Sequence, residues 1–175
     1  MSGKYKFHNP DGIYFVSFAV VGWADIFIRN VYKNNLLDSF RHCQKEKGLV
    51  IYAWVIMSSH AHLIISRNGI IPLEDIMRDM KKFTAHKIIG AIMENPHESR
   101  KEWILEMFEK FGIANSNNTK YQFWQQDNHP VELDNNKMKD ERLDYIHNNP
   151  VKAGYVYKPE DYIYSSAIDY CDEKG

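Results

Sequence analysis

Two apolar segments separated by only two residues place the strongest constraint on the fold. Leu49–Met57 is almost continuously apolar, which predicts a strand that is buried on both faces. His60–Ser66 predicts a second strand, and the short break at Ser58 and Ser59 favours a hairpin between the two. We therefore expect a sheet that is organised around this hairpin.

Strand and helix patterns alternate on both sides of the hairpin. Ile13–Val21 is β-branched and aromatic between two glycines, which predicts a strand. Apolar residues recur at helical spacing from Asn30 to Lys47, and Gly48 is expected to end that helix. The remaining expected elements are helices at 72–93, 98–111 and 135–149, the last stopped by Pro150, and a strand at Tyr121–Gln126.

The order strand, helix, strand, strand, helix, strand predicts the ferredoxin-like, split βαβ plan. We expect an α+β protein with an antiparallel sheet, helices on one face and an additional C-terminal helix. The chain has 175 residues and shows no repeat or linker, which favours one domain over residues 1–175. Within it, residues 98–120 are a possible insertion or lid, and residues 155–175 form a C-terminal tail.

Composition excludes some classes of protein. The formal net charge is -1, which argues against a chain that binds polyanions through overall basic charge, although a local basic face remains possible. The apolar run at 13–21 is too short to span a bilayer, and the residues before it lack the architecture of a signal peptide. The two cysteines, Cys43 and Cys171, are expected to be reduced thiols, so we expect a cytoplasmic protein with no membrane partner.

His60 and His62 form a possible metal site. Side chains alternate along a strand, so both imidazoles are expected on one face while Ala61 points into the core. Two adjacent nitrogen donors can hold one divalent ion. The alternative is a pair of half-exposed strand histidines with no ligand.

Tyr145 and Asn149 are spaced one helical turn apart, and Arg142 is expected on the same stripe. A tyrosine followed by an amide can supply a nucleophile and a metal ligand. The amide oxygen is a hard donor that suits Mg2+ or Mn2+ better than zinc. The alternative is that Tyr145 packs on the sheet and Asn149 caps the helix before Pro150.

A cationic stretch lies in the helix expected at 72–93. Its permanent cations include Arg78, Lys81, Lys82 and Lys87, and such clusters bind phosphate backbones. A solvated helix face is the alternative. Trp124 is a further nucleic-acid-binding candidate because aromatic rings stack on exposed bases, although a role in the core suits it equally.

These segments resemble a known family. Residues 56–65 (IMSSHAHLII) resemble the metal-binding strand of the one-tyrosine HUH transposases. Residues 123–126 (FWQQ) and 145–154 (YIHNNPVKAG) resemble the downstream signature of the REP-associated tyrosine transposases, and the resemblance spans most of the chain. Ser58 and Ser59 depart from the Pro-Asn pair that is common before the first histidine, which concerns the shape of the turn and not metal ligation.

The resemblance implies a ferredoxin-like fold and a set of roles. His60, His62 and Asn149 would bind a divalent metal, Mg2+ or Mn2+, and Tyr145 would be the catalytic nucleophile. The substrate would be single-stranded DNA near a hairpin such as a REP-like palindrome, cleaved and rejoined through a 5′-phosphotyrosine. Arg142, from its charge, and Trp124, from its aromatic ring, are the further candidates for contact with the nucleic acid, and the protein would act as a monomer or a homodimer.

Three other functions fit parts of the pattern. One is a domesticated protein that binds hairpin DNA without cleaving it. Another is a metal-independent RNA endonuclease on a ferredoxin-like scaffold, with histidine and tyrosine as acid and base. The third is a zinc hydrolase built on the histidine pair, for which Asp127 and His129 are the additional candidate residues.

Overall fold

A computed structural model describes residues 6–115, 120–126 and 129–171 of the chain. The strands are β1 (Tyr14–Ala19), β2 (Leu49–Ile56), β3 (His60–Arg67) and β4 (Val131–Glu132). The longer helices are α1 (Asn30–Lys47), α2 (Leu73–Glu94), α3 (Lys101–Ile113) and α4 (Asn136–Lys152). Short 3-10 turns lie at Val21–Trp23, Ile26–Ile28, Pro159–Asp161 and Ala167–Tyr170.

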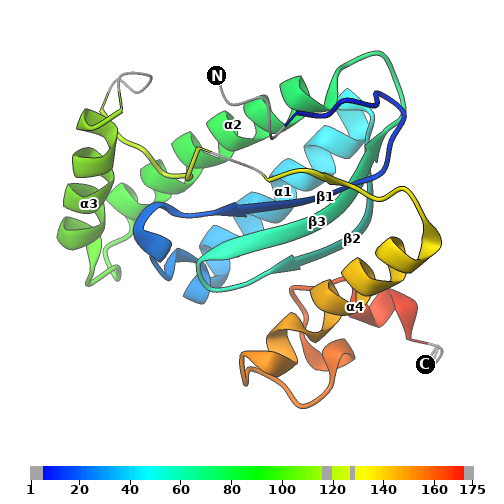
Figure 1. The fold of residues 1–175 in the computed structure, drawn as a ribbon. Helices are drawn as coiled ribbons and strands as arrows, with labels where there is room; N and C mark the ends of the chain where they lie inside the picture. The colour runs from blue at the N-terminus through cyan, green and yellow to red at the C-terminus, as the bar shows by residue number, and fades with distance from the viewer. Residues whose placement is uncertain (1–5, 116–119, 127–128, 172–175) are drawn as a thin grey trace.

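The strands form one antiparallel sheet in the order β2-β3-β1-β4. This order, with α1 before the β2–β3 hairpin and α2 after it, confirms the ferredoxin-like α+β fold. Figure 1 shows α1 and α2 together on one side of the sheet and α4 on the other side. The expectation that α4 is an addition to the basic fold is consistent with this placement.

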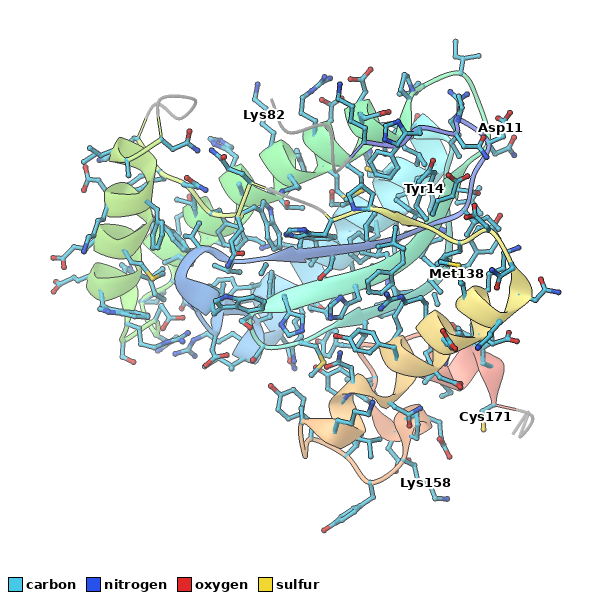
Figure 2. The ribbon with its side chains drawn as sticks, viewed as in Figure 1. Asp11, Tyr14, Lys82, Met138, Lys158 and Cys171 are labelled. Carbon is cyan, nitrogen blue, oxygen red and sulfur yellow. The ribbon has the colours of Figure 1, made fainter. Side chains whose placement is uncertain are left out.

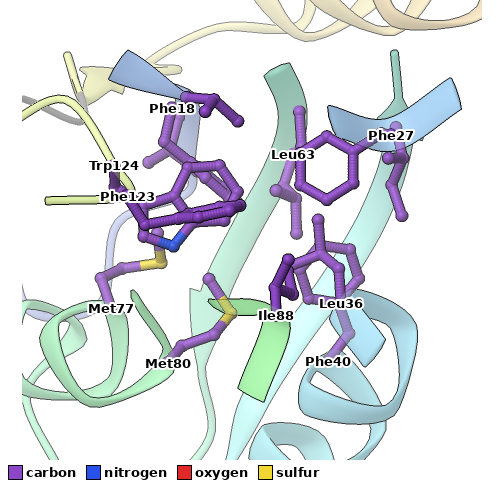
Figure 3. Packing of buried hydrophobic residues seen from close by; sticks show 14 of the residues in the cluster. Phe18, Phe27, Leu36, Phe40, Leu63, Met77, Met80, Ile88, Phe123 and Trp124 are labelled. Carbon is purple, nitrogen blue, oxygen red and sulfur yellow. The ribbon is translucent and has the colours of Figure 1, made fainter. Parts of the chain in front are cut away.

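The larger apolar core lies between the sheet and the pair α1 and α2. It includes Phe18, Leu63, Met77 and Trp124 among its buried side chains (Figure 3). A smaller cluster on the opposite face joins Phe15, Ile64 and other strand residues to Ile146 of α4. Because side chains alternate along β3, this second face also carries His60 and His62.

The predicted fourth strand is wrong in its position. Tyr121–Gln126 meets the end of β1 through one isolated bridge, between Trp124 and Val20, with hydrogen bonds from Val21 N to Phe123 O and from Gln125 N to Ala19 O, whereas the strand that pairs with the start of β1 is β4. The carbonyl groups of Gln125 and Gln126 accept hydrogen bonds from Lys81 Nζ on α2. These two carbonyl groups therefore face α2 and do not extend a ladder beside β1.

The C-terminal tail covers the outer edge of β2. Ser166 N donates to Trp54 O and Ile56 N donates to Tyr164 O, both at 2.9 Å, and Ser166 Oγ accepts from Trp54 N. An isolated bridge also joins Ser165 to Val55. The tail thus occupies backbone groups that an edge strand would otherwise expose.

Among the described residues, no helix is long and apolar enough to cross a membrane.

A buried carboxylate joins the start of α1 to the connection between α2 and α3. The Glu98 side chain has 0% exposure and accepts hydrogen bonds from Arg29 Nε at 2.7 Å and Arg100 Nε at 3.0 Å. Burial raises the pKa of Glu98, but the hydrogen bonds from Arg100 and Arg29 outweigh burial and lower the pKa to about 2.

We expect Glu98→Gln to lower the free energy of unfolding by about 3 kcal/mol at pH 7, because it leaves two arginine side chains without their anion. Because folding lowers the carboxyl pKa from about 4.5 to about 2, Glu98 stabilises the folded state at pH values above about 4.5. This stabilisation is lost as the pH falls towards 2. Urea unfolding at pH 7 and pH 3 should therefore show a smaller penalty at pH 3. Glu102→Gln, at an exposed position on α3, is the matched control, and an equal penalty at both pH values would contradict this account.

Candidate active site

The two histidines of β3 lie side by side on the α4 face of the sheet. Their ring centroids are 4.8 Å apart, with an interplanar angle of 71°. Ala61 between them is fully buried on the opposite face, as the alternation predicts. The residues of β1 directly opposite the histidines are small, Ala19 across from His60 and Ser17 across from His62, so no bulky β1 side chain lies directly opposite either imidazole.

His62 has two buried ring nitrogens without a partner. It is 5% exposed, and neither Nδ1 nor Nε2 has a hydrogen-bond partner among the described residues. Such a group costs about 1–3 kcal/mol when left unsatisfied. The pKa of His62 is lowered to about 3, mainly by burial and further by the neighbouring His60 and Arg142. The ring is therefore neutral at neutral pH. A neutral, unpartnered imidazole is the form that binds a metal ion.

A serine of the hairpin turn orients the His60 side chain. Its Nδ1 forms a hydrogen bond with Ser59 Oγ at 3.1 Å, and the tautomer that donates from Nδ1 leaves Nε2 available as a ligand. Burial lowers the pKa of His60, while the charge of Asp25 acts in the opposite direction. Ser58 Oγ donates to Asp25 Oδ1 at 2.6 Å, so both serines of this turn have defined structural roles.

Tyr145 of α4 faces the histidine pair of the same chain. Its ring lies 5.2 Å from the ring of His62 and 5.9 Å from that of Phe15, in edge-on geometry to both. Phe15 in turn stacks on His62 at 5.4 Å. The tyrosine remains 37% exposed, so its ring is packed at one side while the residue stays open to solvent.

Arg142 lies one turn before Tyr145 and is half-buried. Its guanidinium carbon is 4.7 Å from the Phe15 ring centroid and 6.0 Å from that of Tyr145. These contacts place a permanent positive charge beside the tyrosine and close enough to lower the pKa of His62. The cluster of His60, His62, Tyr145 and Arg142 can therefore face one anionic group.

Helix α4 continues through Pro150, contrary to the prediction that the proline stops it. Pro150 lies in the last turn, where the loss of one N–H removes a single helical hydrogen bond. Gly154, at φ +77°, closes the helix, since Gly154 N donates to Val151 O and Tyr155 N donates to Pro150 O. The Pro-Val-x-Ala-Gly block is therefore the C-terminal cap of the helix that carries Tyr145.

Asn149 lies one turn after Tyr145 and is half-buried. The Asn149 side chain makes no hydrogen bond to another described residue, so its amide oxygen is available to a ligand. The predicted alternative, that the Asn149 side chain caps the helix, is therefore wrong. The described residues contain no group of three or more His, Cys, Asp or Glu side chains that could hold a metal. A site on His60 and His62 thus requires a different third donor, and Asn149 is the predicted one. His129 joins no such group, and Asp127 lies outside the described residues.

The predicted basic face lies on the other side of the sheet from this site. Figure 2 shows Lys82 on α2 and Met138 on α4 at opposite sides of the molecule. Arg78 is paired with Asp75 and Asp79 but its side chain stays 66% exposed, and Lys81 Nζ donates to backbone carbonyl groups. Lys82 and Lys87 are exposed and remain predicted contacts for nucleic acid.

The structure contradicts a base-stacking role for Trp124. Its side chain is 5% exposed, stacks on Phe27 at 5.8 Å and donates from Nε1 to Thr84 Oγ1 at 3.0 Å. A buried indole with a satisfied N–H is a core residue. The sequence analysis instead missed Trp23 and Phe15, which contact His60 and His62 respectively.

The structure therefore combines a ferredoxin-like sheet, a histidine pair on one strand and a tyrosine on a C-terminal helix, the arrangement that the resemblance to the one-tyrosine HUH transposases implies. Residues 24–110 match the family model described as Transposase IS200 like. This match runs from the turn after β1 into α3 and includes the histidine pair, so the chain is similar to this family of transposases.

A solved structure shows the same fold. The chain is similar to the REP-associated tyrosine transposase bound to a REP hairpin, at 19% identity and a TM-score of 0.68, covering 97% of this chain and 84% of that one. A Deinococcus radiodurans protein provisionally assigned as a transposase matches at 16% identity and a TM-score of 0.47, over 84% of this chain and 97% of the other. No curated protein matches by sequence.

Proposed function

We propose that this protein cleaves and rejoins single-stranded DNA through a covalent bond between Tyr145 and a 5′ phosphate. The observation that carries the proposal is the contact of Tyr145, which is still open to solvent, with His62, a buried histidine whose ring nitrogens have no partner. A nucleophile beside unsatisfied metal-ligand nitrogens is an arrangement for phosphoryl transfer rather than for packing.

The donor set fits a divalent cation. His60 and His62 would supply neutral nitrogens and Asn149 an amide oxygen, which together suit Mn2+ or Mg2+. When bound, the cation would polarise the scissile phosphate and offset its negative charge. Arg142 would add a second positive charge next to the same phosphate.

The proposed step conserves atoms and charge. The Tyr145 oxygen loses its proton to solvent and attacks the phosphorus, and the bond from phosphorus to the 3′ oxygen breaks. The 3′ oxygen leaves and takes up a proton, which yields a 5′-phosphotyrosine and a free 3′ hydroxyl. Attack by another 3′ hydroxyl on the phosphotyrosine reverses the step and joins two strands without a nucleotide cofactor.

A hairpin beside the cut is the substrate class that we propose. Its support is the fold shared with the REP-associated tyrosine transposase, whose structure contains a REP hairpin. The RNA-endonuclease alternative is less well supported, because a histidine with a pKa of about 3 is a poor general acid near neutral pH. Lys82 and Lys87 would serve as phosphate contacts for the duplex part of such a substrate.

The test is capture of a covalent adduct from a DNA library. Single strands that carry a hairpin with a randomised stem and randomised flanks are incubated with the protein and Mn2+, and adducts that survive denaturation are recovered and sequenced. We expect recovered strands to share a cut site, with the 5′ end of the downstream fragment attached to protein. Adducts that form equally well in EDTA would contradict the metal assignment, and no adduct with any strand would contradict the proposed activity.

A further inference from the structure

A sharp turn after β1 exposes a tryptophan next to the histidine pair. Trp23 is 60% exposed, and its ring centroid lies 5.6 Å from that of His60. Its backbone φ is +54°, in the left-handed region, and the preceding Gly22 has φ +63°. A bulky aromatic residue rarely adopts this conformation, and it persists only where the surrounding structure fixes it.

Hydrogen bonds on two sides fix the turn. Val20 N donates to Ser59 O and Val21 N donates to Phe123 O, both at 2.9 Å. Beyond Trp23, Phe27 N donates to Ser58 O at 2.8 Å. The turn and the hairpin residues before His60 are thus tied together, so the backbone of Trp23 is held beside the histidine pair, and its indole contacts His60 while much of its surface stays in water.

The same turn leads to an aromatic groove on α3, which lies beside it in Figure 1. A Cβ atom on Gly22 would come within 3.1 Å of Met107 Sδ and 3.5 Å of the Phe111 ring, so the turn packs directly on this helix. The groove has a volume of about 430 Å3, and Trp103, Met107, Lys110 and Phe111 are among its lining residues. Trp103 is 54% exposed.

We propose that Trp23 stacks on a base of the single strand that flanks the scissile phosphate, and that the groove on α3 receives bases further along the strand. This inference rests on the proposed function. An exposed aromatic ring that a fixed backbone carries next to the reacting groups is a preorganised stacking platform. It explains why a tryptophan occupies a backbone position that glycine would adopt without strain, although the exposed ring gains little from packing.

The test separates stacking from a structural role. All variants carry Tyr145→Phe so that only binding is measured, with a 20-residue oligothymidylate and an abasic strand of the same length as probes. We expect Trp23→Gly to weaken oligothymidylate binding about 5- to 150-fold and to leave binding of the abasic strand unchanged. Trp23→Phe should retain part of the affinity, and Tyr157→Ala, at a 99% exposed position, should retain all of it.

Stability and metal binding provide the second readout. Glycine relieves the left-handed strain, so we expect the melting temperature of Trp23→Gly to equal or exceed that of the parent. Its Mn2+ affinity by calorimetry should be unchanged. Unchanged oligothymidylate affinity, an equal loss for both probes, or a loss of Mn2+ binding would overturn the inference. If the inference about Trp23 fails but the library still yields Tyr145 adducts, the proposed function stands without the inference. If no adduct forms and neither probe binds, the inference and the proposed function both fail.

Discussion

Tyr145→Phe is expected to abolish covalent attachment to DNA, with a loss of at least about 10⁴-fold in the rate of strand cleavage. The variant lacks the oxygen that would attack the phosphorus, and no other described tyrosine is in ring contact with His62. The measurement is the rate of adduct formation on strands recovered from the library, followed on denaturing gels. Rejoining should be lost to the same extent, because it proceeds through the same phosphotyrosine.

The structure also predicts that this variant folds normally. The phenyl ring would keep its edge contacts with His62 and Phe15, and the hydroxyl makes no hydrogen bond to another described residue. The free energy of unfolding should therefore change by less than about 0.5 kcal/mol. Tyr155→Phe is the matched control, since Tyr155 is 46% exposed just beyond α4 and should retain full activity. An adduct that persists in Tyr145→Phe would remove this residue from the nucleophilic role.

His62→Leu is expected to eliminate Mn2+ binding and, at the same time, to stabilise the metal-free protein by about 1 kcal/mol. The reason is that both ring nitrogens of His62 are buried without partners, whereas leucine has a similar volume and no polar atom to satisfy. A residue kept for packing alone would not combine these two effects.

Calorimetric titration with Mn2+ and urea unfolding in EDTA measure the two quantities. His42→Leu is the control, because His42 is exposed on α1, across the sheet from the site. It should leave Mn2+ affinity unchanged. Undiminished Mn2+ affinity in His62→Leu would contradict the metal site, and destabilisation of the metal-free variant would show that the imidazole contributes to packing in a way that this structure does not predict.

Local patterns in the sequence predicted the features that depend on local physics. The hairpin followed from two apolar runs and a two-residue break, and helix α1 has the predicted bounds because Gly48 adopts φ +72° at its end. The side-by-side placement of His60 and His62 follows from strand alternation alone. Tyr145 and Asn149 were recognised as a pair because of their helical spacing and the family resemblance.

Features that depend on tertiary partners were missed or wrong. Trp124 has the composition of a stacking residue, but its N–H is satisfied by Thr84 from a helix distant in sequence. Trp23 escaped notice because its role depends on proximity to His60, which only the pairing of β1 with β3 produces. A tryptophan directly after a glycine at the end of a strand was the available signal.

The most direct test of the central claim is the chemical identity of the attached residue. Tryptic digestion of the adduct, after nuclease trimming of the DNA, should release the peptide of residues 143–152, which contains Tyr145 as its single tyrosine. We predict that mass spectrometry finds this peptide with a 5′-linked nucleotide on Tyr145. A nucleotide attached to any other residue, or linked through its 3′ phosphate, would contradict the account.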